Sequence, residues 1–288
     1  MDLLDYAFMQ RALIAAFLVG ITAPAIGTYL VQRRQAVMGD GIGHVAMTGV
    51  ALGFLLNTSP VWMATLVAVV GAVGMELIRS RGKTSGDIAL AMLFYGGLAG
   101  GVLIINMAGG STANLSSYLF GGIATVAPQD VTAAVILAAF VITVTIGLRR
   151  QLFAISQDEE FARVTGLPVR ALNLLMAVTA AVTVTVAMRI VGLLLVSAMM
   201  VIPVAAAQRV TRGFVATLSL AMAIGVVVSL TGVTATYYLD APSGATIVLL
   251  AIAVFTVMAA VSTPLARRRA KAARIAAEEV CTRDDVKV

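Results

Sequence analysis

The chain has 288 residues, of which 60% are hydrophobic and 12% are charged, and its formal net charge is +6 at pH 7. This composition excludes a soluble globular domain and is typical of a protein that crosses a membrane many times. The single cysteine, Cys281, excludes a disulfide framework and a thiolate metal cage, so a metal ion would have to bind through oxygen and imidazole nitrogen atoms.

Long apolar runs separated by turn signals predict an all-α fold, a polytopic bundle of transmembrane helices. Roughly 20 helical residues cross the core of a bilayer, and they must satisfy their backbone hydrogen bonds internally. About nine spans are predicted, with eight also possible. They lie near residues 10–31, 36–56, 61–79, 88–106, 129–148, 169–187, 190–207, 213–234 and 243–265. Residues 1–266 thus form one transmembrane domain, followed by a basic tail over residues 267–288.

The basic residues predict how the bundle is oriented. Lys and Arg concentrate in the cytoplasmic loops of membrane proteins. With nine helices, every Lys and Arg except Arg11 and Arg189 falls in the loops of one side or in the tail. The N-terminus is therefore expected outside and the C-terminus in the cytoplasm. The stretch 109–126 is then an external loop or a short re-entrant piece, because another full crossing would invert every later loop.

The only histidine of the chain, His44, follows Asp40 by four residues within the second predicted helix. This spacing places both side chains on one helical face, about 6 Å apart along the axis. A carboxylate and an imidazole at membrane depth are costly and typical of ion pathways, and the pair suits zinc, manganese or ferrous iron alike. Two donors are fewer than a metal site needs. An alternative therefore stays open, in which Asp40 caps the helix and His44 makes a core hydrogen bond.

A second informative stretch follows the fifth predicted span, on the side expected to be cytoplasmic. Ser156 and Glu159 have the spacing of a capping box, Gly166 fits the position after the last turn, and Pro168 prevents continuation. A short amphipathic helix is predicted over about 157–165. Its acidic start disfavours an anionic membrane surface, so a groove on a protein partner is favoured. The side chains on its apolar and charged edges are Asp158, Glu159, Glu160, Phe161, Arg163 and Val164.

Two weaker features concern ions and nucleotides. Asp240, at the outer end of the eighth predicted span, could attract or gate a cation, although an interfacial loop is the simpler interpretation. The run Arg81–Thr84 resembles the end of a phosphate-binding loop, but that motif requires glycine where Leu77 stands. If transport here uses ATP, the ATPase is therefore another chain.

Together, these stretches resemble the integral-membrane permease subunits of ABC-type uptake systems for zinc, manganese and iron. The similarity covers most of the chain, from about residue 10 to 265, although Gly41 and Gly43 replace the usual alanine and serine of that family. Several blocks in the right order are more specific than any single one. These blocks are Arg33–His44, Asp158–Asn173, Arg189–Ala207 and Tyr238–Leu250.

The resemblance implies a multi-pass permease of the bacterial plasma membrane, which is not itself an enzyme and binds no permanent cofactor. It implies import of a divalent metal, zinc first and manganese or iron next, with Asp40, His44 and, more weakly, Asp240 along the path. The partners would be a second copy of the chain, cytoplasmic ATP-binding subunits, an external metal-binding lipoprotein and the lipid bilayer, with no nucleic acid. A secondary cation transporter or channel using Asp40 and His44 is the alternative. The residues that would couple the permease to the ATPase are Asp158, Glu159, Glu160, Phe161, Arg163 and Gly166.

Overall fold

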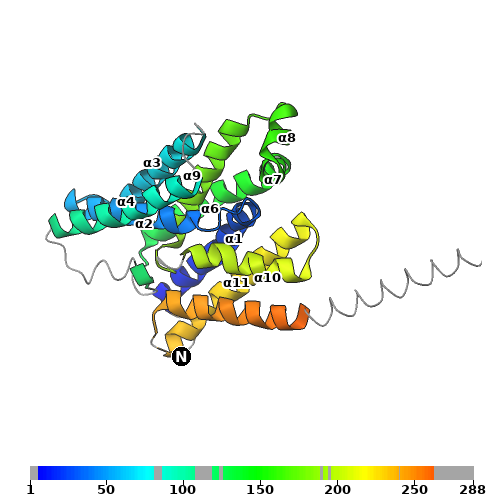
Figure 1. Cartoon of the computed structure of the whole chain (residues 1–288). Helices are drawn as coiled ribbons and strands as arrows, with labels where there is room; N and C mark the ends of the chain where they lie inside the picture. Colours follow the sequence, from blue (N-terminus) through cyan, green and yellow to red (C-terminus); the bar gives the residue numbers. More distant parts are fainter. Residues whose placement is uncertain are drawn as a thin grey trace, which may run out of the picture.

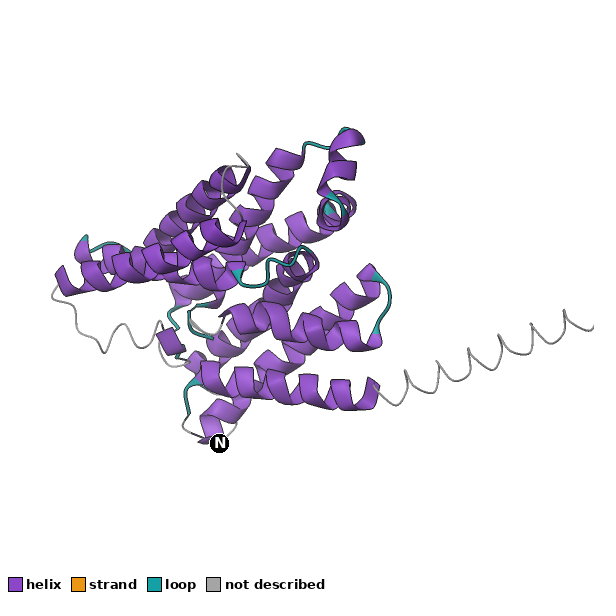
Figure 2. Ribbon diagram, viewed as in Figure 1, coloured by secondary structure: helices purple, strands orange, loops and turns teal. Residues whose placement is uncertain are grey.

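A computed structural model describes residues 6–80, 86–107, 119–122, 126–188, 191–193, 196–239 and 241–262. These residues contain helices and no strand, as Figure 2 shows, which confirms the all-α fold. The helices are α1 (Ala7–Gln32), α2 (Met38–Leu55), α3 (Pro60–Ser80), α4 (Gly86–Met107), α6 (Pro128–Gly147), α7 (Arg149–Gln157), α8 (Glu159–Val164), α9 (Val169–Ala187), α10 (Val196–Val210) and α11 (Phe214–Leu239). A further helix spans Ser243–Ser262. Asp240 and the tail 267–288 lie outside the described residues.

A helix is present at each of the nine predicted segments. Within the described part of the chain, seven helices are long and apolar enough to cross a membrane. The other two are α2, which carries Asp40 and His44, and α10, which has only 15 residues. Nine spans and the orientation of the termini therefore stay predictions.

Two helices organise the bundle. Helix α1 packs on α6, α9, α10 and α11, while α2 packs mainly on α3 and α4 and also contacts α9 and α10. Figure 1 shows α2, α3 and α4 as one group and α10, α11 and the orange helix Ser243–Ser262 as another. Small residues allow close approach between helices where lipid supplies no hydrophobic driving force. At Gly20 of α1, for example, a Cβ would lie 2.7 Å from the Cα of Val226 in α11.

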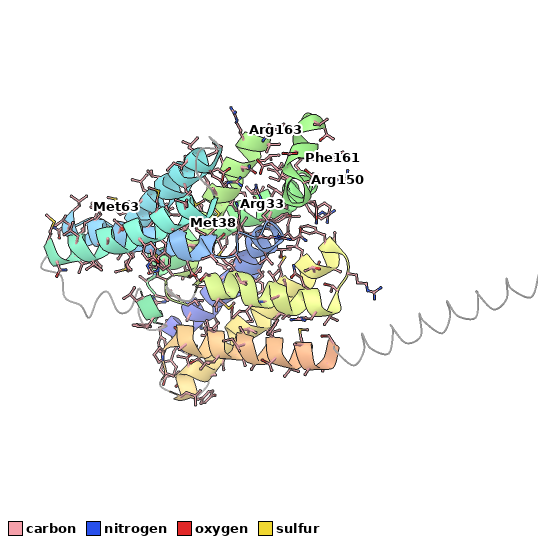
Figure 3. The ribbon with its side chains drawn as sticks, viewed as in Figure 1. Arg33, Met38, Met63, Arg150, Phe161 and Arg163 are labelled. Atoms are coloured by element: carbon pink, nitrogen blue, oxygen red, sulfur yellow. The ribbon has the colours of Figure 1, made fainter. Side chains whose placement is uncertain are left out.

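Basic side chains gather at one end of the bundle, here called the basic end. Arg33 follows α1, Arg79 lies in the last turn of α3, and both contact Glu159 of α8. Figure 3 shows Arg33 and Arg163 in this region, together with Phe161, while Met63 lies toward the other end of α3. This is the end that the sequence predicts to be cytoplasmic.

The short helical segment at the basic end differs from its prediction. Two helices occur there, because α7 precedes α8 and carries Ser156 within its own last turn. Ser156 donates a hydrogen bond to the carbonyl of Leu152 at 2.7 Å, whereas Asp158 caps α8 by accepting from the N–H of Phe161 at 2.9 Å. The predicted capping box of Ser156 and Glu159 is therefore wrong. Both Ser156 and Asp158 are good capping residues, and the chain leaves helical geometry at Asp158.

The end of α8 follows its prediction. Gly166 has a φ of +84°, the left-handed conformation that glycine adopts without strain. Its N–H donates to the carbonyl of Arg163 at 3.2 Å, and the N–H of Leu167 donates to the carbonyl of Ala162 at 3.1 Å. This pair of bonds is the Schellman arrangement that satisfies the last carbonyls of a helix, so the predicted position of Gly166 directly after the last turn is confirmed.

Most of the stretch 109–126 lies outside the described residues. The backbone of residues 119–122 packs against the turn between α9 and α10, where a Cβ on Gly192 would lie 2.6 Å from the nitrogen of Gly121. Gly192 has a φ of +85°, so glycine is needed there for both space and conformation. Whether this stretch is an external loop or re-entrant stays a prediction.

Candidate metal site

One face of α2 is polar and partly exposed. Asp40, His44 and Thr48 follow one another at four-residue intervals, and each retains some exposure while the residues between them are buried. A four-residue interval stacks side chains on the same helical face. The structure therefore brings Asp40 and His44 together as the spacing predicted, and it adds Thr48 one turn further along.

Asp40 does not cap α2. The helix begins after Val37 without a side-chain cap, and the Asp40 carboxylate instead accepts a hydrogen bond from the Ser197 hydroxyl in the first turn of α10. Gly39 permits this approach, since a Cβ there would lie only 3.2 Å from Cβ of Ser197. Asp40 thus joins α2 to α10 through this hydrogen bond. The other oxygen lone pairs of its carboxylate remain open to a further ligand.

One ring nitrogen of His44 lacks a hydrogen-bond partner in the part of the chain that the structure describes. Its imidazole lies at the edge of the Phe94 ring of α4, with centroids 4.2 Å apart and an interplanar angle of 70°. Nδ1 is buried and has no hydrogen-bond partner among the described residues. A buried polar atom left unsatisfied costs about 1–3 kcal/mol. Within the described part of the chain, this nitrogen therefore does not make the core hydrogen bond of the alternative interpretation.

Close packing of α4 on α2 fixes the His44 backbone. The Thr48 hydroxyl donates to the carbonyl of Gly97 at 2.7 Å. A Cβ on Gly97 would lie 2.7 Å from the carbonyl carbon of His44 and 2.6 Å from the nitrogen of Val45. On another side of α2, a Cβ on Gly43 would lie 3.3 Å from the carbonyl oxygen of Leu193. The polar face is therefore held by backbone contacts that tolerate little displacement.

A single chain supplies few metal donors. Among the described residues, no three His, Cys, Asp or Glu side chains are grouped closely enough to hold a metal ion. The donors at hand are the Asp40 carboxylate, the His44 imidazole and the Ser197 hydroxyl. Transition metals in proteins take four to six donors. The remaining donors would have to come from water, from residues outside the described part such as Asp240, or from another chain.

The exposed side of α8 is a candidate surface for a protein partner. Phe161 is 65% exposed and Val164 is 86% exposed, while Ala162 between them is fully buried. The charged residues Asp158, Glu160 and Arg163 are exposed as well. An exposed apolar edge flanked by charges is typical of a helix that docks into a groove.

Glu159 does not share this exposed side. Its carboxylate accepts hydrogen bonds from Arg33 at 2.9 Å and from Asn173 at 3.2 Å, and Nη2 of Arg163 lies 3.6 Å away. Sequence reasoning missed Arg33 and Asn173 because they lie 126 and 14 residues from Glu159, and no local pattern joins them.

Arg33 needs these partners. Its side chain is only 6% exposed. Burial lowers the pKa of the Arg33 guanidinium, and the positive charge of Arg79 acts in the same direction, while Glu159 and Glu76 oppose both. A buried charge is tolerated only when it is paired and hydrogen-bonded, so Glu159 stabilises Arg33 in place.

Comparisons with known proteins agree with a transport role. A model of the ABC 3 transport family matches residues 5–262. The chain is 31% identical over 268 residues to a probable metal transport system membrane protein of Treponema pallidum, covering 92% of this chain and 100% of that one. It is also 31% identical over 254 residues to the manganese transport system membrane protein MntC of Halalkalibacterium halodurans, covering 88% and 87%. The solved structure of PsaBC from Streptococcus pneumoniae in complex with Fab is similar, with a TM-score of 0.79, 31% identity and coverage of 89% and 92%.

Proposed function

This chain belongs to the ABC 3 transport family, and we propose that it is the membrane permease of an ATP-driven importer in which the polar face of α2 carries the metal ion. It is a multi-pass protein of the bacterial membrane and not itself an enzyme. The observation that carries the proposal is that Asp40 shares one face of α2 with His44, whose buried Nδ1 has no partner among the described residues.

For the transported ion we propose manganese, with zinc and ferrous iron as competitors. The family resemblance favoured zinc, whereas the residues themselves did not choose among the three metals. Near the site, however, oxygen donors outnumber nitrogen donors, since Asp40 and Ser197 accompany the single imidazole of His44. Oxygen donors suit manganese better than they suit softer ions, and the relative from Halalkalibacterium halodurans is named for manganese transport.

A second copy of the chain is proposed to complete the path. One chain offers one carboxylate and one imidazole at the site, and this face of α2 keeps some exposure in the isolated chain. Two copies facing each other would supply two of each, which is enough for a four-donor set. An external metal-binding lipoprotein would deliver the ion, and nucleotide-driven closure of separate ATPase subunits would shift the site from outward to inward access.

The exposed side of α8 is proposed as the contact with the ATPase. Phe161→Ala is expected to weaken binding of the ATPase to the permease by at least about tenfold, because a large apolar anchor in a groove carries much of the binding free energy. Binding would be measured by titrating the labelled ATPase onto permease held in nanodiscs. Tyr238→Ala is the matched control, since Tyr238 is a similarly exposed aromatic residue, at 73%, at the C-terminal end of α11. Equal affinity of the Phe161→Ala variant and the wild-type permease would remove α8 from the contact.

Uptake of radioactive manganese and zinc tests the function itself. Proteoliposomes would hold this chain with its ATPase and carrier protein, with and without ATP. Uptake that requires ATP and is faster for manganese is the expected result. Flux through this chain alone, without ATP, would instead favour the secondary transporter or channel, and faster zinc uptake would restore zinc, the metal that the family resemblance placed first.

A further inference from the structure

Three side chains from different parts of the fold form a closed hydrogen-bonded ring at the basic end. Arg33, after α1, donates from Nη1 to Oδ1 of Asn173 in α9 at 2.7 Å and from Nη2 to Oε2 of Glu159 in α8 at 2.9 Å. Asn173 closes the ring by donating from Nδ2 to Oε1 of Glu159 at 3.2 Å. We call this ring the joint.

Helix α3 connects to the joint through a second pair of charges. Arg79 donates to both carboxylate oxygens of Glu76, at 2.9 Å each, and its Nη2 lies 3.6 Å from Oε2 of Glu159. Glu76 is 5% exposed and Asn173 is 4% exposed, so most of the network is shielded from water. Low local polarity makes such hydrogen bonds strong and makes their loss costly. The network therefore ties α8 to α1, α3 and α9.

The attachment of α8 depends heavily on this network. The helix has six residues, and its larger apolar side chains, Phe161 and Val164, point away from the bundle. Ala162 is its buried apolar contact. A helix so short has little packing of its own, so a displacement of α8 has to pull on Glu159 and, through it, on Arg33.

Arg33 in turn is joined to α2 by a short, bonded turn. Arg34 has a φ of +59°, which reverses the chain, and the N–H of Gln35 donates to the carbonyl of Leu30 at 2.9 Å. Helix α2 then begins at Met38, with Asp40 in its first turn. The connection leaves few residues to absorb movement between Arg33 and the metal-binding face.

We propose that the joint transmits the movement of α8 to α2 and thereby links ATP hydrolysis to exposure of the Asp40–His44 site. This inference rests on the proposed function, and it assigns Glu159 a different role from that of its exposed neighbours. Arg33, Glu159 and Asn173 are positioning residues, because none of them touches the transported ion.

The chain offers matched controls for the joint. Arg150 of α7 is an exposed charge outside both the joint and the exposed side of α8, and Arg34 is a neighbouring arginine that is exposed. Glu159→Gln keeps the size of the side chain and removes its charge, so metal uptake per ATP hydrolysed is expected to fall by at least about fivefold. Arg150→Gln should leave that ratio unchanged. Arg33→Lys keeps the charge but loses the two-armed contact, and it should act like Glu159→Gln, with Arg34→Lys as its control.

A different result is expected if Glu159 and Arg33 only stabilise the folded complex. In that case uptake and ATP hydrolysis fall in the same proportion as the amount of assembled complex, which size-exclusion chromatography reports. Such a proportional loss, or an unchanged ratio in both Glu159→Gln and Arg33→Lys, would overturn the proposal.

A second readout follows α2 without using the metal. The only cysteine, Cys281, is replaced by serine, and Thr48→Cys then serves as a reporter one turn beyond His44. Its modification by an impermeant maleimide is timed with and without a non-hydrolysable ATP analogue. The rate is expected to respond to nucleotide in the Arg150→Gln background and to lose that response in the Glu159→Gln background. An equal response in both backgrounds would refute the role proposed for the joint. If the wild-type protein shows no ATP-dependent uptake, only the proposed function is refuted.

Discussion

Replacing His44 by leucine is expected to abolish metal uptake while leaving the permease at least as stable as the wild-type protein. Leucine fills a similar volume beside Phe94, so the packing of the imidazole is largely retained. It also removes Nδ1, which is buried without a partner among the described residues. Removing an unsatisfied polar atom is neutral or stabilising. Loss of a metal ligand, in contrast, should weaken metal binding by about a hundredfold or more.

The comparison of stability with uptake separates a ligand from a packing residue. Thermal unfolding in nanodiscs and ATP-driven uptake of manganese would be measured on the same preparations. Thr48→Val is the control, because Thr48 lies on the same face and, among the described residues, its hydroxyl bonds only backbone carbonyls, that of Gly97 at 2.7 Å and that of His44 at 3.5 Å. Asp40→Asn should behave as His44→Leu does in uptake. Normal uptake by the His44→Leu variant would exclude that residue from the path, and a large loss of thermal stability would show that its role is in packing.

The sequence predicted the helices well because the bilayer imposes a simple rule. Backbone groups in lipid must bond within their own segment, so a long apolar run has to be a helix. The relation between Asp40 and His44 also followed from the sequence, because it depends only on the period of one helix. Both predictions concern a single element and require no knowledge of its neighbours.

Contacts between helices could not be predicted in the same way. Ser197 reaches Asp40 across 157 residues of sequence, and Phe94 lies beside His44 because α4 packs on α2. The orientation of the Glu159 side chain was missed for the same reason. The sequence of this short helix shows that one edge is charged, but it does not show which of those charges faces Arg33. Local patterns place a side chain on a face of a helix, whereas packing decides what that face meets.

The boundary between α7 and α8 shows the limit of local rules themselves. Ser156 and Asp158 are both residue types that cap helices. Choosing Ser156 predicted one helix from about 157 to 165, whereas the structure has two helices that meet at Asp158. Burial determines which of the two residues caps α8. Ser156 and Leu152 are buried on the inner side of α7, so that helix continues through Gln157 and Asp158 is left to cap the next one.

Two neighbouring glycines of α4 provide the sharpest test of the packing around the site. Gly97→Ala is expected to destabilise the permease by about 1–3 kcal/mol, the usual cost of overpacking, because its Cβ would meet backbone atoms of His44 and Val45 at 2.7 and 2.6 Å. Backbone cannot rotate aside as a flexible side chain can, so α4 must move away from α2. Thermal unfolding should show the loss, and manganese uptake should fall with it.

Gly96→Ala is the matched control, and its effect on stability should have the opposite sign. A Cβ on Gly96 would meet nothing within 4 Å, and Gly96 is exposed. Alanine is more favourable than glycine in a helix by up to about 1 kcal/mol, so this variant should be as stable as the wild-type protein or slightly more stable. If both variants unfold alike, α4 does not lie against α2 as described. If Gly97→Ala loses stability but keeps uptake, the position of α4 does not set the geometry of His44, and the donors that complete the site must hold the imidazole in place.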